Sequence, residues 1–253
     1  MTIDSIWIPI LCYHRVCPVR ERGQDSPSLC VTPEQFSKQM LLLKVFGYQP
    51  ITVQNLTAIL EDRKLPPKKA VCITFDDGYK DNYLYAFPIL KRFSYPATIF
   101  LVTHNIGLKN FWDSGSLSLL NFNEIEEMSF KGIQFGSHTA SHLDLSQADE
   151  VLIKKELEIS KKKIEEITSR LDISFCYPYS RLNPLAKELV KEAGFICGFA
   201  GDEGAMEQKQ DLFQLMRIQI FPSTSLFGFW KKLQPWYPKW MRYQKELRKK
   251  YKN

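Results

Sequence analysis

Two adjacent carboxylates that directly follow an apolar run are the first candidates for chemistry in this chain. Residues 71–75 are apolar or β-branched, and Asp76, Asp77 and Gly78 come next. Such a run predicts a buried strand that delivers acids to the edge of a sheet. Because successive strand side chains point to opposite faces, the acids can take different partners only if the strand breaks there, which Gly78 permits. One carboxylate could then hold a metal ion while the other handles a proton.

Two histidines further along supply the other half of a possible metal site. His138 and His142 follow another apolar run, and their i, i+4 spacing would place both imidazoles on one face of a helical turn. Each motif also has a structural interpretation, as a turn or as packed histidines. The chain has only four histidines, however, so two of them in one pair favour a metal site. Two imidazoles and one carboxylate, with positions open to water, form a common centre for hydrolysis.

The elements that must position these side chains follow a repeating order of strand and helix. Strands are expected over residues 8–13, 71–75, 97–102, 133–137, 173–177, 195–200 and 217–221. Parallel strands that close into a barrel bring all their carboxyl ends to one rim. That rim would collect His14, Asp76, Asp77, His138, Tyr179 and Arg217. An open doubly wound sheet is the structural alternative, but the chain has no glycine-rich nucleotide loop.

Capping residues mark where the helices between these strands begin. They are Thr32, Thr52, Asn121 or Asn123, a capping box formed by Ser146 with Asp149, and Asn183. The helix after Ser146 is expected to reach about Arg170, with its lysines and glutamates as a solvated face. Residues 17–29 and 104–119 are expected to be long loops.

Three motifs resemble those of the polysaccharide deacetylase family, also called carbohydrate esterase family 4. They are Thr74-Phe75-Asp76-Asp77-Gly78-Tyr79, Ser137-His138-Thr139-Ala140-Ser141-His142 and Cys176-Tyr177-Pro178-Tyr179, in the family's order and spacing. The opening residues 9–16 resemble a branch whose enzymes include deacetylases of poly-N-acetylglucosamine. The resemblance covers roughly residues 8–221. It implies an α/β fold, a distorted (β/α)7 barrel.

The resemblance also implies a role for each matched residue. Asp77, His138 and His142 would bind one divalent metal ion, with Zn²⁺ as the first expectation, and Asp76 would be the general base. The metal lowers the pKa of a bound water, so that a nearby carboxylate can complete its deprotonation. The backbone N–H at Tyr179 would stabilise the oxyanion. Contacts with the sugar would come from Tyr79, Phe122, Pro178 and Ser180.

The chain departs from the family pattern at several positions. Many members protonate the leaving amine with a late histidine, which the segment 215–220 lacks. His14 or His104 could replace it, and we favour His14 because it ends a strand. The arginine that steadies the base has no match before Tyr177-Pro178, and Arg217, Arg15 or Arg181 could serve. Ser180 replaces a usual glycine, and Phe122 stands where a tryptophan is common.

These features favour a metal-dependent enzyme that removes acetyl groups from an N-acetylated sugar or polysaccharide. One alternative is an amide hydrolase that acts on a lipid-linked or small glycan precursor. Another is a catalytically impaired carbohydrate-binding protein, which the missing late histidine would allow. Asp76 argues against that last interpretation, because a binding module needs no base.

Composition and charge suggest one domain with a distinct end. The chain has 253 residues, of which 44% are hydrophobic, enough for one large core. We expect a catalytic domain over residues 1–225 and a basic, aromatic-rich tail over 226–253. The formal net charge is +6, and residues 231–253 alone carry +8, so the remainder is slightly acidic. This distribution suggests that the tail either contacts an anionic membrane or packs on the barrel, and it gives no indication of nucleic-acid binding.

Two further expectations concern the compartment. The six cysteines form no C-x-x-C pair, so we expect reduced core thiols and not disulfides. The first ten residues lack the basic start of a signal peptide, and no window is apolar enough for a spanning helix. The predicted location is therefore cytoplasmic, or peripheral to the cytoplasmic face of the membrane.

Overall fold

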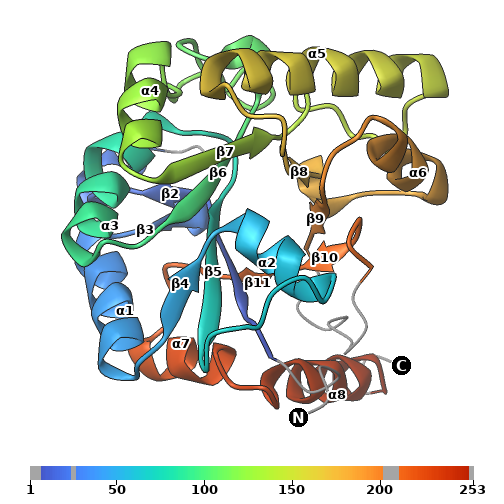
Figure 1. Ribbon diagram of the computed structural model, residues 1–253. Helices are drawn as coiled ribbons and strands as arrows, with labels where there is room; N and C mark the ends of the chain where they lie inside the picture. Colours follow the sequence, from blue (N-terminus) through green and yellow to red (C-terminus); the bar gives the residue numbers. More distant parts are fainter. Residues whose placement is uncertain (1–6, 24–26, 202–210, 251–253) are drawn as a thin grey trace.

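The computed structural model describes residues 7–23, 27–201 and 211–250, with side chains described to residue 247 (Figure 1). Residues 1–6, on which the expected lack of a signal peptide partly rests, lie outside the described part. The same holds for residues 251–253 of the basic tail.

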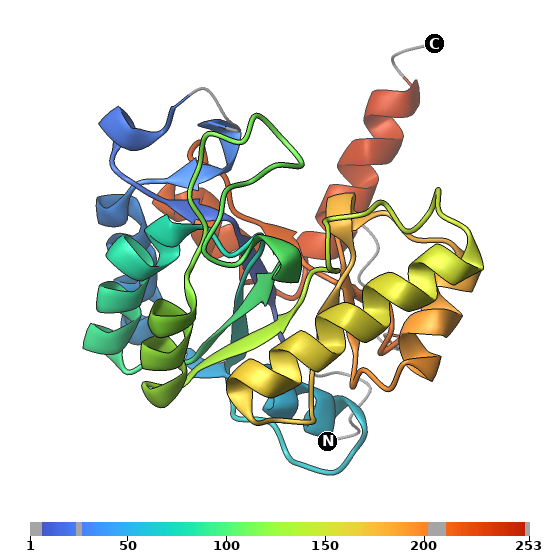
Figure 2. The same ribbon diagram turned by 90° about the horizontal axis from the view of Figure 1, so that it is seen from above.

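A parallel sheet forms the centre of the molecule, with helices on its outside (Figures 1 and 2). Its strand order is β10-β9-β8-β7-β6-β5-β1-β11, and every pair along it is parallel. The strands are β1 (Ile10–Tyr13), β5 (Ala70–Phe75), β6 (Ala97–Leu101), β7 (Ile133–Ser137), β8 (Phe175–Cys176), β9 (Gly198–Ala200), β10 (Leu215–Met216) and β11 (Ile218–Gln219). Each of the seven predicted strands is present, and several are shorter than expected.

One extended segment nearly closes this sheet into a barrel. β10 pairs with β9 at one end of the sheet, and β11 pairs with β1 at the other. Only Arg217 separates β10 from β11, so residues 215–219 act as a single seventh strand that joins both ends. The predicted seven-stranded α/β barrel is therefore confirmed, and the open doubly wound alternative is wrong.

The barrel is distorted beside β5. The short strand β4 (Gln49–Ile51) pairs with the first half of β5, on the edge where β6 pairs with the second half. The sequence did not predict β4, because three residues with a central proline are too short a pattern. A separate two-stranded parallel ribbon, β2 (Arg15–Val16) with β3 (Cys30–Val31), bounds the predicted loop 17–29.

The helices begin largely where the caps predict. They are α1 (Pro33–Val45), α2 (Val53–Leu60), the π-helix η4 (Asn82–Ala86), α3 (Phe87–Phe93), α4 (Phe122–Phe130), α5 (Glu150–Thr168), α6 (Pro184–Glu192), α7 (Leu226–Lys232) and α8 (Tyr237–Lys250). Short 3₁₀ turns are η2 (Val19–Glu21), η3 (Pro27–Leu29), η5 (Thr103–Asn105) and η6 (Pro178–Ser180). The cap of α5 is Asp149 itself, because the side chain of Ser146 instead donates to Asp144.

The basic end of the chain begins as part of the fold. Phe229 of α7, Leu233 and Tyr237 are buried in the main core, and α7 packs against α1. Figure 2 shows α8 extending beyond the barrel. Within the described residues, no helix combines the length and apolar character needed to span a bilayer.

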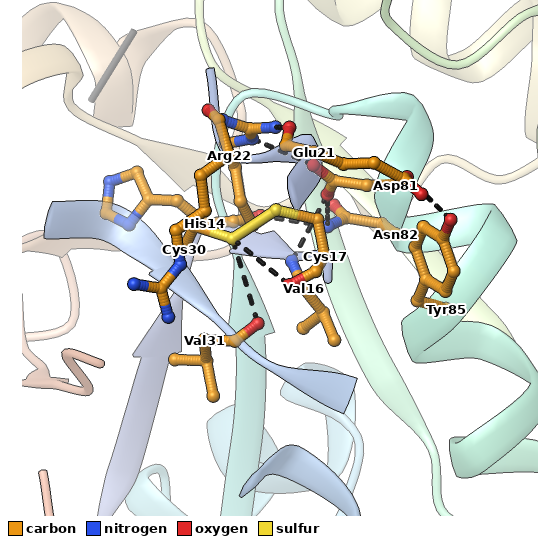
Figure 3. The surroundings of a disulfide bond; sticks show 11 residues. His14, Val16, Cys17, Glu21, Arg22, Cys30, Val31, Asp81, Asn82 and Tyr85 are labelled. Carbon is orange, nitrogen blue, oxygen red and sulfur yellow. Dashed lines mark hydrogen bonds and ion pairs between the residues drawn. A yellow bond between two sulfur atoms is a disulfide. The ribbon is translucent and has the colours of Figure 1, made fainter. Parts of the chain in front are cut away.

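The expectation of six reduced cysteines is wrong for one pair. Cys17 and Cys30 form a disulfide whose Cα atoms are 6.2 Å apart (Figure 3). Cys17 directly follows strand β2, and Cys30 is the first residue of strand β3. The two cysteines meet only because these strands pair in the folded chain. The other four, Cys12, Cys72, Cys176 and Cys197, are free and buried, as expected.

Candidate active site

The carboxyl ends of the strands surround a cavity of about 480 Å³. A space of this size suits a small ligand or part of a larger one. Of the predicted site residues, it is lined by His14, Asp76, Asp77, Tyr79, His138, His142, Tyr179 and Ser180. Other lining residues are Leu29, Trp112, Asp113, Tyr177, Gln219 and Phe221.

A break in the backbone after β5 separates the two neighbouring carboxylates. Asp77 has φ 71° and Gly78 has φ 70°, both in the left-handed region. A Cβ atom at Gly78 would lie 2.6 Å from a side-chain methyl of Leu101, and this close approach together with the left-handed backbone favours glycine there. The strand therefore breaks at Asp77 itself, one residue earlier than the glycine suggests. Left-handed backbone at a residue other than glycine costs free energy and is common at functional sites.

Asp77 lies between the two predicted histidine ligands. Its Oδ1 is 3.4 Å from His138 Nε2 and 3.3 Å from His142 Nε2, and all three side chains are buried. One ligand atom from each residue lies within 4.8 Å of the others. This compact set of two nitrogens and one oxygen fits a zinc-class divalent ion.

The tautomer of His138 also suits a ligand. Its Nδ1 lies 2.8 Å from the carbonyl oxygen of Cys176, which can only accept a hydrogen bond. Nδ1 therefore carries the proton, and Nε2 faces Asp77. A hydrogen bond of this kind to the second ring nitrogen is usual for a metal-binding histidine.

A buried glutamate shapes the loop that carries both histidines. This loop is not helical, since Thr139 and His142 have φ values of 66° and 65°. Glu156 of α5 accepts hydrogen bonds from the backbone N–H groups of Ala140 and Ser141, at 2.8 and 2.9 Å. The predicted helical turn is therefore wrong, although the imidazoles converge. The assignment of Glu156 to a solvated face is also wrong, because the residue is 7% exposed.

Asp76 forms a buried bidentate ion pair with Arg217. Both distances, Nη1 to Oδ1 and Nη2 to Oδ2, are 2.6 Å. Burial alone would raise the pKa of Asp76, but the guanidinium outweighs it and holds that pKa at about 2. Asp76 is therefore ionised at neutral pH, as a proton acceptor must be. The other two arginines that were candidates for this pairing form ion pairs elsewhere. Arg15 pairs with Asp81, and Arg181 pairs with Asp144.

The two histidines that could act as an acid differ in position. His14 lines the cavity, and its Nε2 is 3.8 Å from Oδ2 of Asp76. His104 lies in η5 with its side chain exposed, and it does not line the cavity. His14 therefore lies in the cavity beside Asp76, and His104 lies outside the cavity.

The structure separates the predicted sugar-contacting residues into two groups. Tyr79, Tyr179 and Ser180 line the cavity. Pro178 is buried. Phe122 is exposed at the start of α4, with Lys163 Nζ 5.1 Å from its ring centre. Neither of the last two lines the cavity.

Trp112 is the cavity residue that sequence reasoning missed. Its ring stacks on His142, with centroids 4.7 Å apart and an angle of 19°. Trp112 belongs to the predicted loop 104–119, and it is the sole tryptophan between residues 8 and 229. A lone tryptophan in a long loop was the available signal.

Ser180, which stands where the family usually has glycine, lies against Gly201. A Cβ atom at Gly201 would lie 2.3 Å from Ser180 Oγ, so a larger residue at position 201 would have to displace that hydroxyl. Ser180 has φ 57°, so the backbone keeps the conformation that a glycine would favour.

Comparisons with known proteins agree with this geometry. Residues 63–197 match the family model described as polysaccharide deacetylase. YxkH of Bacillus subtilis, provisionally named a polysaccharide deacetylase, is 32% identical over 87% of this chain and 75% of its own length. The poly-beta-1,6-N-acetyl-D-glucosamine N-deacetylase of Staphylococcus aureus (strain MRSA252) is 30% identical, over 78% of this chain and 70% of its own.

A solved structure has a closely similar fold. It is the deacetylase PplD of Streptococcus pyogenes in complex with acetate, with a TM-score of 0.81 and 30% identity. The match covers 91% of this chain and all of the PplD chain.

Proposed function

Because this chain belongs to the polysaccharide deacetylase family, we propose that it removes N-acetyl groups from an N-acetylated glycan by metal-assisted hydrolysis. The observation that carries the proposal is the division of the two carboxylates. Asp77 faces two imidazoles, whereas Asp76 is ionised against Arg217 in the same cavity. A binding module has no need for a buried, ionised carboxylate of the second kind.

The metal would be held by Asp77, His138 and His142, whose donor atoms suit a zinc-class ion. When bound, such an ion supplies Lewis acidity at the acetamide carbonyl and lowers the pKa of water. The need for a strong base is thereby reduced, so a carboxylate with a pKa of about 2 can serve.

The residues of this chain would then perform the proton transfers. Asp76 accepts a proton from the attacking water, and Arg217 holds the carboxylate ionised and in orientation. His14 is close enough to Asp76 to donate a proton to the leaving amine. The backbone N–H of Tyr179 is the proposed donor to the oxyanion.

Aromatic side chains around the cavity suit a sugar ring. Tyr79, Trp112 and Tyr179 present flat apolar surfaces beside polar groups, as a pyranose requires. The names of two relatives support the same substrate class, since one cleaves acetyl groups from poly-N-acetylglucosamine and the other binds acetate. We therefore propose an N-acetylglucosamine polymer as the first substrate to test.

The test is release of acetate and free amine from an N-acetylglucosamine oligomer, together with metal content. Release that disappears with a chelator and returns with zinc would support the proposal. Metal binding without release from any N-acetylated sugar would instead favour a carbohydrate-binding protein. Release only from short or lipid-linked sugars would favour the precursor hydrolase.

The proposed acid can be tested with two matched histidine variants. His14→Ala is expected to lower turnover by roughly 10²-fold or more, because the leaving amine loses its proton donor. His104→Ala removes an imidazole outside the cavity. It should change turnover by less than about twofold, because the activation free energy of the reaction is then nearly unchanged. Both are measured as amine release at saturating substrate. Equal, small effects would mean that another group donates the proton.

We also propose that the end of the chain contacts an anionic membrane surface. Exposed apolar side chains gather there, namely Leu226, Phe227, Trp236, Trp240 and Tyr243. Residues 231–253 carry nine basic residues and only Glu246 as an acid. Aromatic rings and cations together suit the headgroup region, and each cation near such a surface contributes about 1 kcal/mol. Some of this surface also packs on itself, since Lys231 lies over the rings of Phe227 and Trp240.

Vesicle sedimentation can test this contact. Cutting the chain at Ser225 would remove Phe229 and Leu233 from the core, so substitutions are the better probe. The native chain should sediment with phosphatidylglycerol vesicles at low salt and release at high salt. Trp236→Ala/Trp240→Ala should bind several-fold less. A control, Phe130→Ala/Leu171→Ala, removes two exposed apolar residues elsewhere. Equal sedimentation of all three chains would exclude the contact.

A further inference from the structure

We propose that the disulfide ring of residues 17–30 is a clamp that positions His14 and Leu29 at the wall of the cavity. The inference rests on the proposed deacetylase function, since it concerns how the same cavity is held. It predicts that efficient hydrolysis requires Cys17 and Cys30 to be joined.

The ring starts three residues after one cavity-lining residue, His14, and contains another, Leu29. His14 precedes Arg15, the first residue of β2, and Leu29 precedes Cys30, the first residue of β3. The ribbon itself has only two residue pairs, extended by a hydrogen bond of 3.1 Å from Cys17 N to the Val31 carbonyl. So short a ribbon is not stable on its own. The covalent bond is therefore the strongest link that keeps both strands, and the residues beside them, in register.

A buried arginine ties the ring to the rest of the barrel. Arg15 is 3% exposed, and its Nε donates to Asp81 Oδ2 at 2.8 Å. Its Nη1 and Nη2 donate to the carbonyls of Arg22 and Glu21, at 2.6 and 3.2 Å. The guanidinium also lies 5.5 Å from the ring centre of Tyr79, another residue of the cavity wall. One side chain thus links the ring, the start of η4 and the cavity.

The start of η4 holds His14 as well as the ring (Figure 3). Asn82 Nδ2 donates to the carbonyl of His14 at 2.8 Å, and Val16 N donates to Asp81 Oδ1 at 3.2 Å. The hydroxyl of Tyr85 donates to Glu21 Oε2 at 2.6 Å. The ring and His14 are therefore held by the same short segment, residues 81–85. Opening the ring would weaken the ring's side of this network and, with it, the support of His14, whereas the proposed ligands His138 and His142 follow β7.

Both cysteines of the disulfide are buried. The bond forms when two thiols exchange with a disulfide of an oxidised thiol partner, which takes up two electrons and two protons and leaves as a dithiol. Such bonds are typical of oxidising compartments and are rare in the cytosol. The cytoplasmic location remains a prediction, and this bond argues against it.

The experiment compares two pairs of cysteine substitutions in the full chain. Cys17→Ala/Cys30→Ala opens the ring, and Cys72→Ala/Cys197→Ala removes two free buried thiols outside the cavity lining. Acetate release from an N-acetylglucosamine oligomer should lose about 10–100-fold in kcat/KM in the first pair only, with unchanged metal content. Asp81→Asn, which weakens the Arg15 contact, should lower kcat/KM in the same direction.

The outcomes separate this inference from the proposed function. Equal kcat/KM in the two pairs would overturn the clamp, even if the native chain is fully active. If the native chain releases no acetate, the proposed function fails. The clamp can then be tested by hydrogen exchange, which does not depend on activity. Opening the ring should speed exchange at residues 14–17 and 29–31, while residues 133–142 keep their protection. Unchanged exchange at the first two segments would overturn it, and urea unfolding of both pairs would reveal a general loss of stability.

Discussion

Replacing Asp76 with asparagine is expected to lower acetate release by about 10²–10⁴-fold while the metal content stays that of the native chain. An amide of nearly the same shape cannot accept the proton of the attacking water. The ligands Asp77, His138 and His142 are untouched, so metal stoichiometry should not change. The measurement is kcat for amine release beside elemental analysis of the same preparation.

The Asp76→Asn variant needs a control for folding, because Arg217 would lose its charged partner. An unpaired buried charge typically costs about 3–5 kcal/mol, although the amide oxygen can still accept from the guanidinium. Urea unfolding should therefore accompany the assay. Asp113→Asn is a matched control, since it neutralises another carboxylate of the same cavity. Near-native turnover in Asp76→Asn would show that the general base lies elsewhere.

Substitution of His138 and His142 by alanine is expected to reduce bound metal from about one ion per chain to almost none. The double variant leaves only Asp77 of the three proposed ligands, and a zinc-class site needs at least three protein ligands. Elemental analysis after dialysis gives the stoichiometry, and His104→Ala serves as the control for an imidazole outside the cavity. Full metal content in the double variant would mean that the site is misassigned.

Metal affinity should also depend on pH. Burial alone would lower the pKa of His138, but Cys176 and the hydrogen bond to Asp77 outweigh it and raise that pKa well above its usual value. The metal-free imidazole thus holds a proton that an incoming ion must displace. Binding should therefore release protons and weaken as the pH falls.

The sequence and the tertiary structure explain different parts of this protein. Local signals are readable in the chain because neighbouring residues decide them. The strand predicted over 133–137 is β7 with the same bounds, and Thr32, Thr52 and Asn121 cap the helices that they predict. An apolar period or a capping side chain acts within a few residues, so folding does not alter its meaning.

The metal ligands are an intermediate case. The sequence determined that Asp77, His138 and His142 belong together, since their types and spacing resemble a family motif. It did not determine how they meet, because the chain adopts left-handed backbone at Asp77, Thr139 and His142. The histidine loop is also held by a distant residue, Glu156, which accepts hydrogen bonds from two of its backbone N–H groups. The predicted helical turn is therefore wrong, although the three side chains do converge.

Only the tertiary structure decided which distant groups support this site. Arg217 meets Asp76 across 141 residues because residues 215–219 close the barrel, and the chain offered two other arginines for the role. Glu156 resembles any surface glutamate until its helix packs over the histidine loop. No sequence pattern indicates that Cys17 and Cys30 pair, because they meet only when the short strands β2 and β3 align. Each of these contacts depends on where whole elements pack, and that position is set by the buried core as a whole and not by any segment alone.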